Sequence, residues 1–303
     1  MSERKTISPS QLDAMGCRLA WFWGYKQGYR AKRSSTALEL GTGIHEALEH
    51  YYGEDHANPV EYFAKWSVKR AEELDLQWDD DVAEMQKSTE LGIGMLKNYM
   101  EVFDGKDDFD VIATEKTLSR PLPIPGTDKL SRCSVVVRLD GLVRDHASGR
   151  LFSLEHKTFS RFSASALALN HQFIAQVFVG QTLAQSLGLD EPVIGVIYNG
   201  LRKQAPGPKV KLALNERHKI YCTDRQLEVF QYRAYWQYRE MNRSGVPIYP
   251  QPNQIKCSSC DFKDVCTEYQ RGGDWQFILK ESFTQRNQKT TEQNSITEDS
   301  EED

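Results

Sequence analysis

One stretch, residues 134–158, constrains the fold more than any other, because it is typical of two strands joined by a short turn. Its first half is rich in β-branched residues and ends at Asp140-Gly141, and its second half runs from Leu151 to Lys157. Side chains alternate between faces along a strand, so Glu155 and Lys157 project together, and strand pairing would bring Asp140 beside them. Two carboxylates and an ammonium in an apolar hairpin are costly unless a metal ion or a substrate uses them.

Length and composition place this hairpin in an ordinary polar protein. The chain has 303 residues, of which 39% are hydrophobic and 27% charged, enough for one large domain or two small ones. No apolar run reaches the length of a membrane span, and the opening residues MSERKTISPSQ lack the apolar core of a signal peptide. We therefore expect a cytoplasmic protein. Disulfides are rare in that compartment, so the six cysteines favour a metal or cluster role for those that are suitably spaced.

The net charge of −5 is unevenly distributed. Residues 283–303 carry a net charge of −4 and almost no large apolar side chain, which predicts a disordered acidic tail. Basic strips at residues 1–38 and 202–219 could hold a polyanion or form a solvated charged face, and charge alone leaves both readings open.

The densest local signal is a group of three cysteines, Cys257, Cys260 and Cys266, with two and then five residues between them. This spacing in a short polar segment is typical of a soft metal centre. A fourth thiolate must come from far away in the sequence, and Cys17 is the best candidate, because Cys133 and Cys222 lie in the apolar contexts of buried structural cysteines. The spacing does not decide between zinc and iron–sulfur.

Several helices are predicted around the hairpin. Residues 37–52 have an apolar stripe at helical spacing, which predicts a helix with one buried face. His45 lies beside this stripe and is either a metal ligand or a structural histidine. Residues 58–108 are expected to form a helical insertion or cap, interrupted by a solvated loop at the acids 79–81. A long helix over 164–187 would carry Gln172 and Gln176 on one face.

Other candidate residues lie in strands, in loops and near the start of the chain. A strand over 109–115 ends at Glu115, which is a candidate site acid or an edge-strand solubiliser. Aromatic residues alternate with basic ones from Cys17 to Arg33, so Arg18 and Tyr25 could bind single-stranded nucleotides, although core packing also explains the aromatics. Arg202 and Lys203 open a basic loop.

Together these motifs resemble the RecB-like branch of the PD-(D/E)XK nuclease superfamily, and within it the CRISPR-associated and phage-encoded exonucleases that carry an iron–sulfur cluster. The resemblance spans residues 8–269. It is carried by Gly41-Thr42-Gly43-Ile44-His45, Arg138-Leu139-Asp140-Gly141, Glu155-His156-Lys157, Gln172, and the cysteines 17, 257, 260 and 266. Where the family usually has a tyrosine one turn after the helix glutamine, this chain has Gln176.

The resemblance implies an α/β fold: a restriction-endonuclease-like core with a central mixed β-sheet flanked by helices. It also implies a helical insertion and an iron–sulfur clasp joining the N- and C-terminal segments. We accordingly expect a single nuclease domain over 1–282, with the insertion at 58–108, a cluster-binding segment at 250–270, and the disordered tail at 283–303.

The resemblance also assigns roles to residues. His45, Asp140, Glu155 and the backbone carbonyl of His156 would hold Mg²⁺ or Mn²⁺, with Glu115 at the edge of the site. Asp140, Glu155 and Lys157 would be catalytic, with Lys157 orienting or deprotonating the attacking water. A [4Fe–4S] cluster would be bound by Cys17, Cys257, Cys260 and Cys266. Contacts with DNA are expected from Gln172, Gln176, Arg18, Tyr25, Arg202 and Lys203.

The function implied is a divalent-metal-dependent DNA exonuclease acting on single strands or duplex ends. Its setting would be recombination, repair, phage replication (in the host cytoplasm) or CRISPR spacer processing, with other copies of the chain or recombination and CRISPR-adaptation proteins as partners. The first alternative is a non-catalytic DNA-binding or adaptation-complex subunit stabilised by a metal cluster. The second is a zinc-stapled DNA-binding scaffold.

Overall fold

The computed structural model describes residues 4–32, 36–74, 79–160, 163, 167–204 and 215–286. These residues form two compact units. The first comprises Met1–Pro9 and Ser35–Trp236, and the second comprises Ser10–Ser34 and Gln237–Asp303. That the chain up to residue 282 works as a single nuclease domain stays a prediction.

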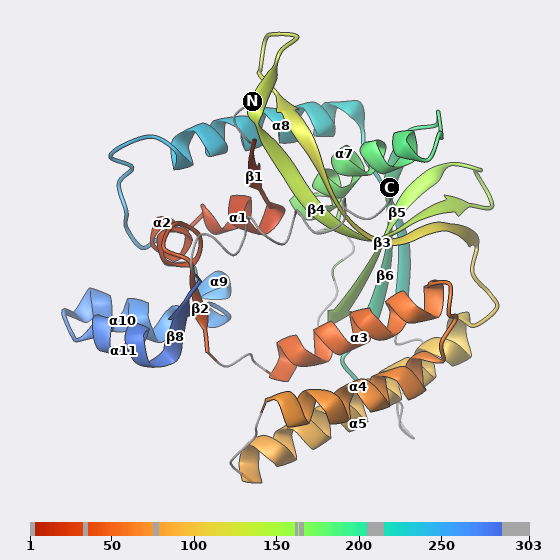
Figure 1. Cartoon of the computed structure of the whole chain (residues 1–303), viewed down its shortest axis with the longest axis horizontal. Coiled ribbons are helices and arrows are strands. Elements are labelled where there is room, and N and C mark those ends of the chain that lie inside the picture. Colours follow the sequence, from red (N-terminus) through yellow and green to blue (C-terminus); the bar gives the residue numbers. More distant parts are fainter. Residues whose placement is uncertain are drawn as a thin grey trace, which may run out of the picture. The chain divides into compact units, whose positions relative to one another are not determined.

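The first unit is built on a six-stranded mixed sheet (Figure 1). The strands β1 (Lys5–Ile7), β4 (Leu130–Asp145), β5 (Leu151–Phe159), β6 (Val193–Arg202) and β7 (Asn215–Tyr221) pair in that order, and β3 (Phe109–Pro123) also pairs with β4. The β1–β4 and β5–β6 pairs are parallel, and the others are antiparallel. The hairpin predicted from the sequence is confirmed, because β4 and β5 are antiparallel neighbours with Gly141 opposite Leu154.

Helices cover both faces of this sheet because its central strands are apolar on both sides. Val143, Phe152 and Leu154 face one core, with α3 (Thr36–Tyr52), α4 (Pro59–Glu73) and α5 (Asp79–Phe103). Their chain neighbours Leu142 and Leu151 face the other, with α7 (His171–Ser186). The last long helix is α8 (Asp224–Met241). Burial on both faces is typical of strands at the centre of an α/β sheet.

Two predicted boundaries differ from the structure. The acids Asp79, Asp80 and Asp81 form the first turn of α5 and not a loop, because negative side chains are stabilised at a helix N-terminus. The helix carrying Gln172 begins at His171, since the Asn170 side chain accepts a hydrogen bond from the Gln172 N–H at 2.9 Å and caps it. Residues 164–166, where its start was predicted, lie outside the described residues.

The second unit joins short segments from near both ends of the sequence. Its elements are α1 (Pro9–Ala14), α2 (Arg18–Trp21), the π-helix η1 (Phe22–Lys26), β2 (Tyr29–Ala31), α9 (Gln254–Ser258), α10 (Lys263–Arg271), α11 (Trp275–Ser282) and β8 (Phe283–Gln285). The strands β2 and β8 are antiparallel, and Leu19, Trp23, Phe262 and Val265 lie in the core.

Strand β8 occupies the first three residues of the predicted disordered tail. Phe283 is buried and stacks on Phe262 with ring centroids 4.9 Å apart, which explains why the ordered chain extends past residue 282. The rest of the predicted tail, from residue 287, lies outside the described residues. Among the described helices, none is both long and apolar enough to cross a membrane.

Candidate active site

A cleft of about 480 Å³ in the first unit brings most of the predicted site residues together. Helix α3 contributes His45, strand β4 contributes Asp140, and β5 contributes Glu155 and Lys157. The cleft is also lined by Glu115, Gln172 and Lys203, by Thr42 and Arg138, which the sequence analysis named only as parts of motifs, and by Leu38 and Thr158, which it did not name. Leu38, Thr42 and His45 follow one another at helical spacing, so the helical face of His45 is the signal that could have found the first two.

Asp140 lies where the β4–β5 ladder ends, one residue before the last pair, Gly141 and Leu154. Its carboxylate accepts a hydrogen bond from the His156 N–H at 2.7 Å, and His45 Nδ1 lies 3.4 Å from the same oxygen. Burial lowers the pKa of His45, but the hydrogen bond and charge of Asp140 outweigh burial and leave that pKa raised. The pKa of Asp140 is lowered, because its contacts with His45 and His156 outweigh the effect of burial.

Glu155 is almost fully enclosed, with 1% of its surface exposed. One carboxylate oxygen lies 2.6 Å from Lys157 Nζ and accepts a hydrogen bond from Gln172 Nε2 at 2.8 Å. The other oxygen accepts a hydrogen bond from Gln176 Nε2. Burial, and then the charge of Asp140, raise the pKa of Glu155 despite the nearby lysine. The buried carboxylate of Glu155 is therefore close enough to Asp140 for the two negative charges to repel each other.

The chemistry of these donors fits a hard divalent cation. Carboxylate oxygens, a backbone carbonyl and one imidazole are ligands that Mg²⁺ and Mn²⁺ accept, and such an ion would relieve the repulsion between Asp140 and Glu155. As they stand, both carboxylates are engaged by protein donors. Within the described ranges, no three or more His, Cys, Asp or Glu side chains are already arranged to hold a metal ion.

A buried polar network holds His156 from behind. Asn199 Nδ2 lies 2.8 Å from His156 Nδ1 and also donates to the Tyr99 hydroxyl at 2.8 Å. Arg217 donates to Asn199, to Tyr99 and, at 2.6 Å, to Asp107. Burial lowers the pKa of His156 to about 3, so its ring is neutral at physiological pH. The network fixes the strand segment whose backbone carbonyl was predicted as a metal ligand.

The other predicted contact residues in the first unit differ in accessibility. Gln172 and Lys203 line the cleft, and Arg202 is exposed at the end of β6. Gln176 is fully buried, and its amide is directed at Glu155. Glu115 lines the cleft and forms an ion pair with Arg138. Residues 205–214 of the predicted basic loop lie outside the described residues.

Arg18 and Tyr25 belong to the second unit. Arg18 forms an ion pair with Glu240 and lies over the Tyr249 ring, with its guanidinium carbon 5.3 Å from the ring centroid. Tyr25 lies under Arg30, at 5.2 Å. Their predicted role in DNA binding stays a prediction.

The four predicted cluster cysteines also belong to the second unit, and each sulfur faces an N–H donor. Backbone N–H groups of Gln251 and Asn253 donate to Cys17 Sγ at 3.4 Å and to Cys257 Sγ at 3.3 Å. The Cys260 thiol forms a hydrogen bond with the backbone of Phe262, and Gln270 Nε2 lies 3.3 Å from Cys266 Sγ. Burial and the nearby thiols of Cys17 and Cys257 raise the pKa of Cys260 and of Cys266. The described cysteines do not form a ready-made metal group.

Comparison with known proteins adds a family. A sequence model of the PD-(D/E)XK nuclease superfamily matches residues 6–267. No curated protein matches the chain significantly. Among solved structures, a "Putative exonuclease" from Eubacterium rectale is 11% identical, over 85% of this chain and 94% of that one, with a TM-score of 0.42. The family match covers most of the chain and every motif at the cleft. The chain therefore belongs to the PD-(D/E)XK nuclease superfamily.

Proposed function

We propose that this protein is a divalent-metal-dependent DNA exonuclease that hydrolyses phosphodiester bonds of single strands or duplex ends. The observation that carries the proposal is the convergence of His45, Asp140, Glu155 and Lys157 on one cleft. Glu155 is almost fully buried there, and burial together with the charge of Asp140 raises its pKa. A binding scaffold has no physical need for such a costly arrangement.

The metal would be held by Asp140, Glu155, His45 and the His156 carbonyl. When bound, a divalent cation offsets the negative charge of the phosphate and makes a water molecule more acidic. Lys157, held by Glu155 at 2.6 Å, donates hydrogen bonds to the attacking water or to a phosphate oxygen. Gln172 and Gln176 fix the carboxylate of Glu155, so that its oxygens keep one orientation during turnover.

The direct test is digestion of end-labelled single-stranded DNA with Mn²⁺ or Mg²⁺. We expect Asp140→Asn and Lys157→Ala to lower nucleotide release at least about 100-fold, with Lys157→Ala binding DNA nearly as well as the wild type. Asp110→Asn is the matched control, because the Asp110 carboxylate is 74% exposed and lies outside the cleft. Equal release by wild type and both site variants would contradict the catalytic assignment.

A circular single strand of the same sequence tests the exonuclease part of the proposal. An enzyme that needs a free end leaves the circle intact while it degrades the linear strand. Intact binding without release of nucleotides by the wild type would support the non-catalytic DNA-binding subunit instead. The proposed settings are recombination, repair, phage replication or CRISPR spacer processing.

We further propose a [4Fe–4S] cluster on Cys17, Cys257, Cys260 and Cys266. The N–H donors at all four sulfurs support it, because such hydrogen bonds stabilise cluster thiolates. The three cysteines of the C-terminal segment and the distant Cys17 lie in one unit. Zinc is the competing metal, and measuring iron against zinc in the purified protein decides between them.

A further inference from the structure

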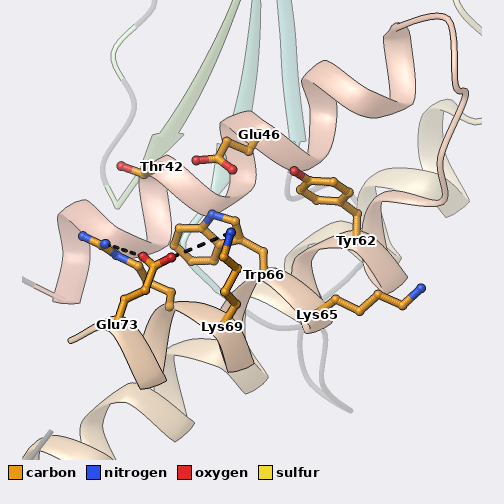
Figure 2. Close-up of a pocket in the computed structure, with 8 residues that line it drawn as sticks. Thr42, Glu46, Tyr62, Lys65, Trp66, Lys69 and Glu73 are labelled. Carbon is orange, nitrogen blue, oxygen red and sulfur yellow. Dashed lines mark hydrogen bonds and ion pairs between the residues drawn. The ribbon is translucent and has the colours of Figure 1, made fainter. Parts of the chain in front are cut away.

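A second groove, of about 510 Å³, runs between α3 and α4 in the first unit (Figure 2). Its lining includes Thr42 and Glu46 from α3, and Tyr62, Trp66, Lys69 and Glu73 from α4. Thr42 and Glu46 also line the active-site cleft. The groove therefore adjoins the cleft across one face of α3.

Trp66 is a fixed aromatic platform in this groove. A Cβ atom at Gly43 would lie 2.5 Å from the six-membered ring of Trp66, so the glycine is what lets the indole lie against α3. The ring also stacks on Phe63, with centroids 5.8 Å apart and an interplanar angle of 17°. Trp66 is only half-buried, and its remaining surface faces the groove.

Tyr62 supplies a second ring on the same helix. It stacks on His50, with centroids 4.1 Å apart, and its hydroxyl is directed toward Glu46 in Figure 2. Burial and the charges of nearby acids raise the pKa of Tyr62, so the phenol stays neutral. The groove thus presents two neutral aromatic side chains, one turn apart on α4.

The three cationic side chains of the groove differ in how firmly protein carboxylates hold them. Arg70 is held by Glu39 at 2.7 Å and by Glu73 at 2.9 Å, so it ties α4 to α3. Lys69 is 78% exposed and only loosely paired with Glu73, at 3.8 Å. Lys65 is exposed, and in Figure 2 it extends away from the indole. Two exposed lysines therefore lie on the same helix as the rings, and the exposed Lys69–Glu73 ion pair costs little to exchange for phosphate.

We propose that this groove binds single-stranded DNA next to the active site, with unpaired bases stacked at Trp66 and Tyr62 and phosphates paired with Lys65 and Lys69. Aromatic stacking combined with a basic margin is how proteins hold single strands irrespective of sequence, whereas a duplex hides the faces of its bases. The inference rests on the proposed function, because continuity with the cleft is what identifies the occupant as the substrate strand.

The test is binding of a fluorescent oligothymidylate with Ca²⁺ in place of Mg²⁺. We expect Trp66→Ala to weaken binding roughly 5- to 100-fold, and Trp66→Phe to retain most of it, since stacking on an aromatic ring is the interaction removed. Lys65→Glu with Lys69→Glu should weaken binding and reduce its salt dependence. Both lysines are exposed, so this double variant does not depend on the packing of Trp66. Lys129→Glu, an exposed charge reversal in the turn between β3 and β4, is the control.

The outcomes separate this inference from the proposed function. If Trp66→Ala and the double lysine variant both bind single strands as well as the wild type, the groove is not a DNA-binding site, even if the wild type cleaves DNA. Equal losses for single-stranded and duplex DNA would overturn stacking as the mode of binding. A third outcome is that the groove variants bind single strands more weakly while the wild type releases no nucleotides with Mg²⁺ or Mn²⁺. That result would support the groove and reject the nuclease.

Discussion

At the scale of single residues, the buried carboxylate of Glu155 accepts hydrogen bonds from the amides of Gln172 and Gln176. The two glutamines differ in burial. Gln176 is fully buried, whereas Gln172 is half-buried at the cleft. We expect Gln176→Leu to lower the free energy of unfolding by about 1–3 kcal/mol, because a buried carboxylate oxygen loses its hydrogen bond. Urea denaturation measures this loss.

Gln172→Leu, the same substitution one turn earlier, is the matched control. The oxygen that Gln172 leaves keeps Lys157 Nζ at 2.6 Å, so this variant should be destabilised less than Gln176→Leu. Both variants should lower nuclease turnover, since both loosen the orientation of Glu155. Equal stability losses would show that burial does not distinguish the two glutamines.

The positions of some of these residues could be predicted from the sequence, and those of others could not. Alternation along a strand placed Glu155 beside Lys157, and both line the cleft as expected. No pattern pointed to Arg217 as a donor to Asn199 and Asp107, because these groups are far apart in the sequence and come together only through the sheet. Gln176 was predicted on the right face of its helix, but sequence alone could not tell that this face is covered.

At the scale of elements, the turn between β4 and β5 is held by Asp145. Its carboxylate is 1% exposed, accepts a hydrogen bond from the Ser148 N–H at 2.9 Å, and forms an ion pair with Lys219 of β7. Burial raises the pKa of Asp145, but these partners outweigh burial and leave that pKa lowered. The charged carboxylate therefore stabilises the fold above the unfolded-state pKa of about 3.9, and this stability is lost as the pH falls through the lower folded-state pKa.

Asp145→Asn should thus lower the free energy of unfolding by about 1–3 kcal/mol at neutral pH. The difference from wild type should shrink below about pH 4, where the wild-type carboxyl also becomes protonated. Asp110→Asn is the control, because that carboxylate is 74% exposed. Urea denaturation at several pH values measures both variants, and a difference that stays constant with pH would contradict the assignment.

Helices α4 and α5 meet closely at Gly92. A Cβ atom there would lie 2.3 Å from the ring of Phe63, which is 1% exposed. We expect Gly92→Ala to destabilise the first unit by about 1–3 kcal/mol, even though alanine favours a helix by up to ~1 kcal/mol. Phe63→Leu in the same chain should recover part of this loss, and thermal unfolding of the four proteins in the cycle measures the coupling. Additive losses would mean that the two side chains do not compete for space.

Element types followed from periodicity more reliably than element ends. The apolar stripe of 37–52 predicted α3 almost to the residue, because one face of that helix is buried in the core. The start of α7 is capped by one hydrogen bond, from the Gln172 N–H to the Asn170 side chain. The start of α5 is marked by three acidic residues, which are equally common in loops. Such local choices are decided by a few groups, so a pattern averaged over many residues does not report them.

At the scale of the whole molecule, the second unit joins Ser10–Ser34 to the C-terminal segment, although more than 200 residues separate Cys17 from Cys257. Its core is small; Trp23 and Phe262 lie in it, and Trp275 packs against Trp23. A core of this size contributes limited hydrophobic stability, and a cluster bound by both segments would add to it. The sequence predicted this partnership of distant cysteines from spacing and from the resemblance.

The last prediction concerns that metal centre. Protein purified without oxygen should be brown and contain iron, and Cys17→Ala should lose as much iron as Cys257→Ala, because each removes one of the proposed ligands. Cys222→Ala should keep its iron, since Cys222 lies in the first unit and serves as the matched control. Iron content and visible absorption measure the loss. If Cys257→Ala loses its iron and Cys17→Ala keeps it, the fourth ligand is a residue other than Cys17. If the wild type contains zinc and no iron, the metal centre is a tetrahedral thiolate site and not a cluster. In either case the second unit should unfold at lower temperature once the metal is removed, because its two segments would then be joined only by non-covalent contacts such as the small core and the β2–β8 pair.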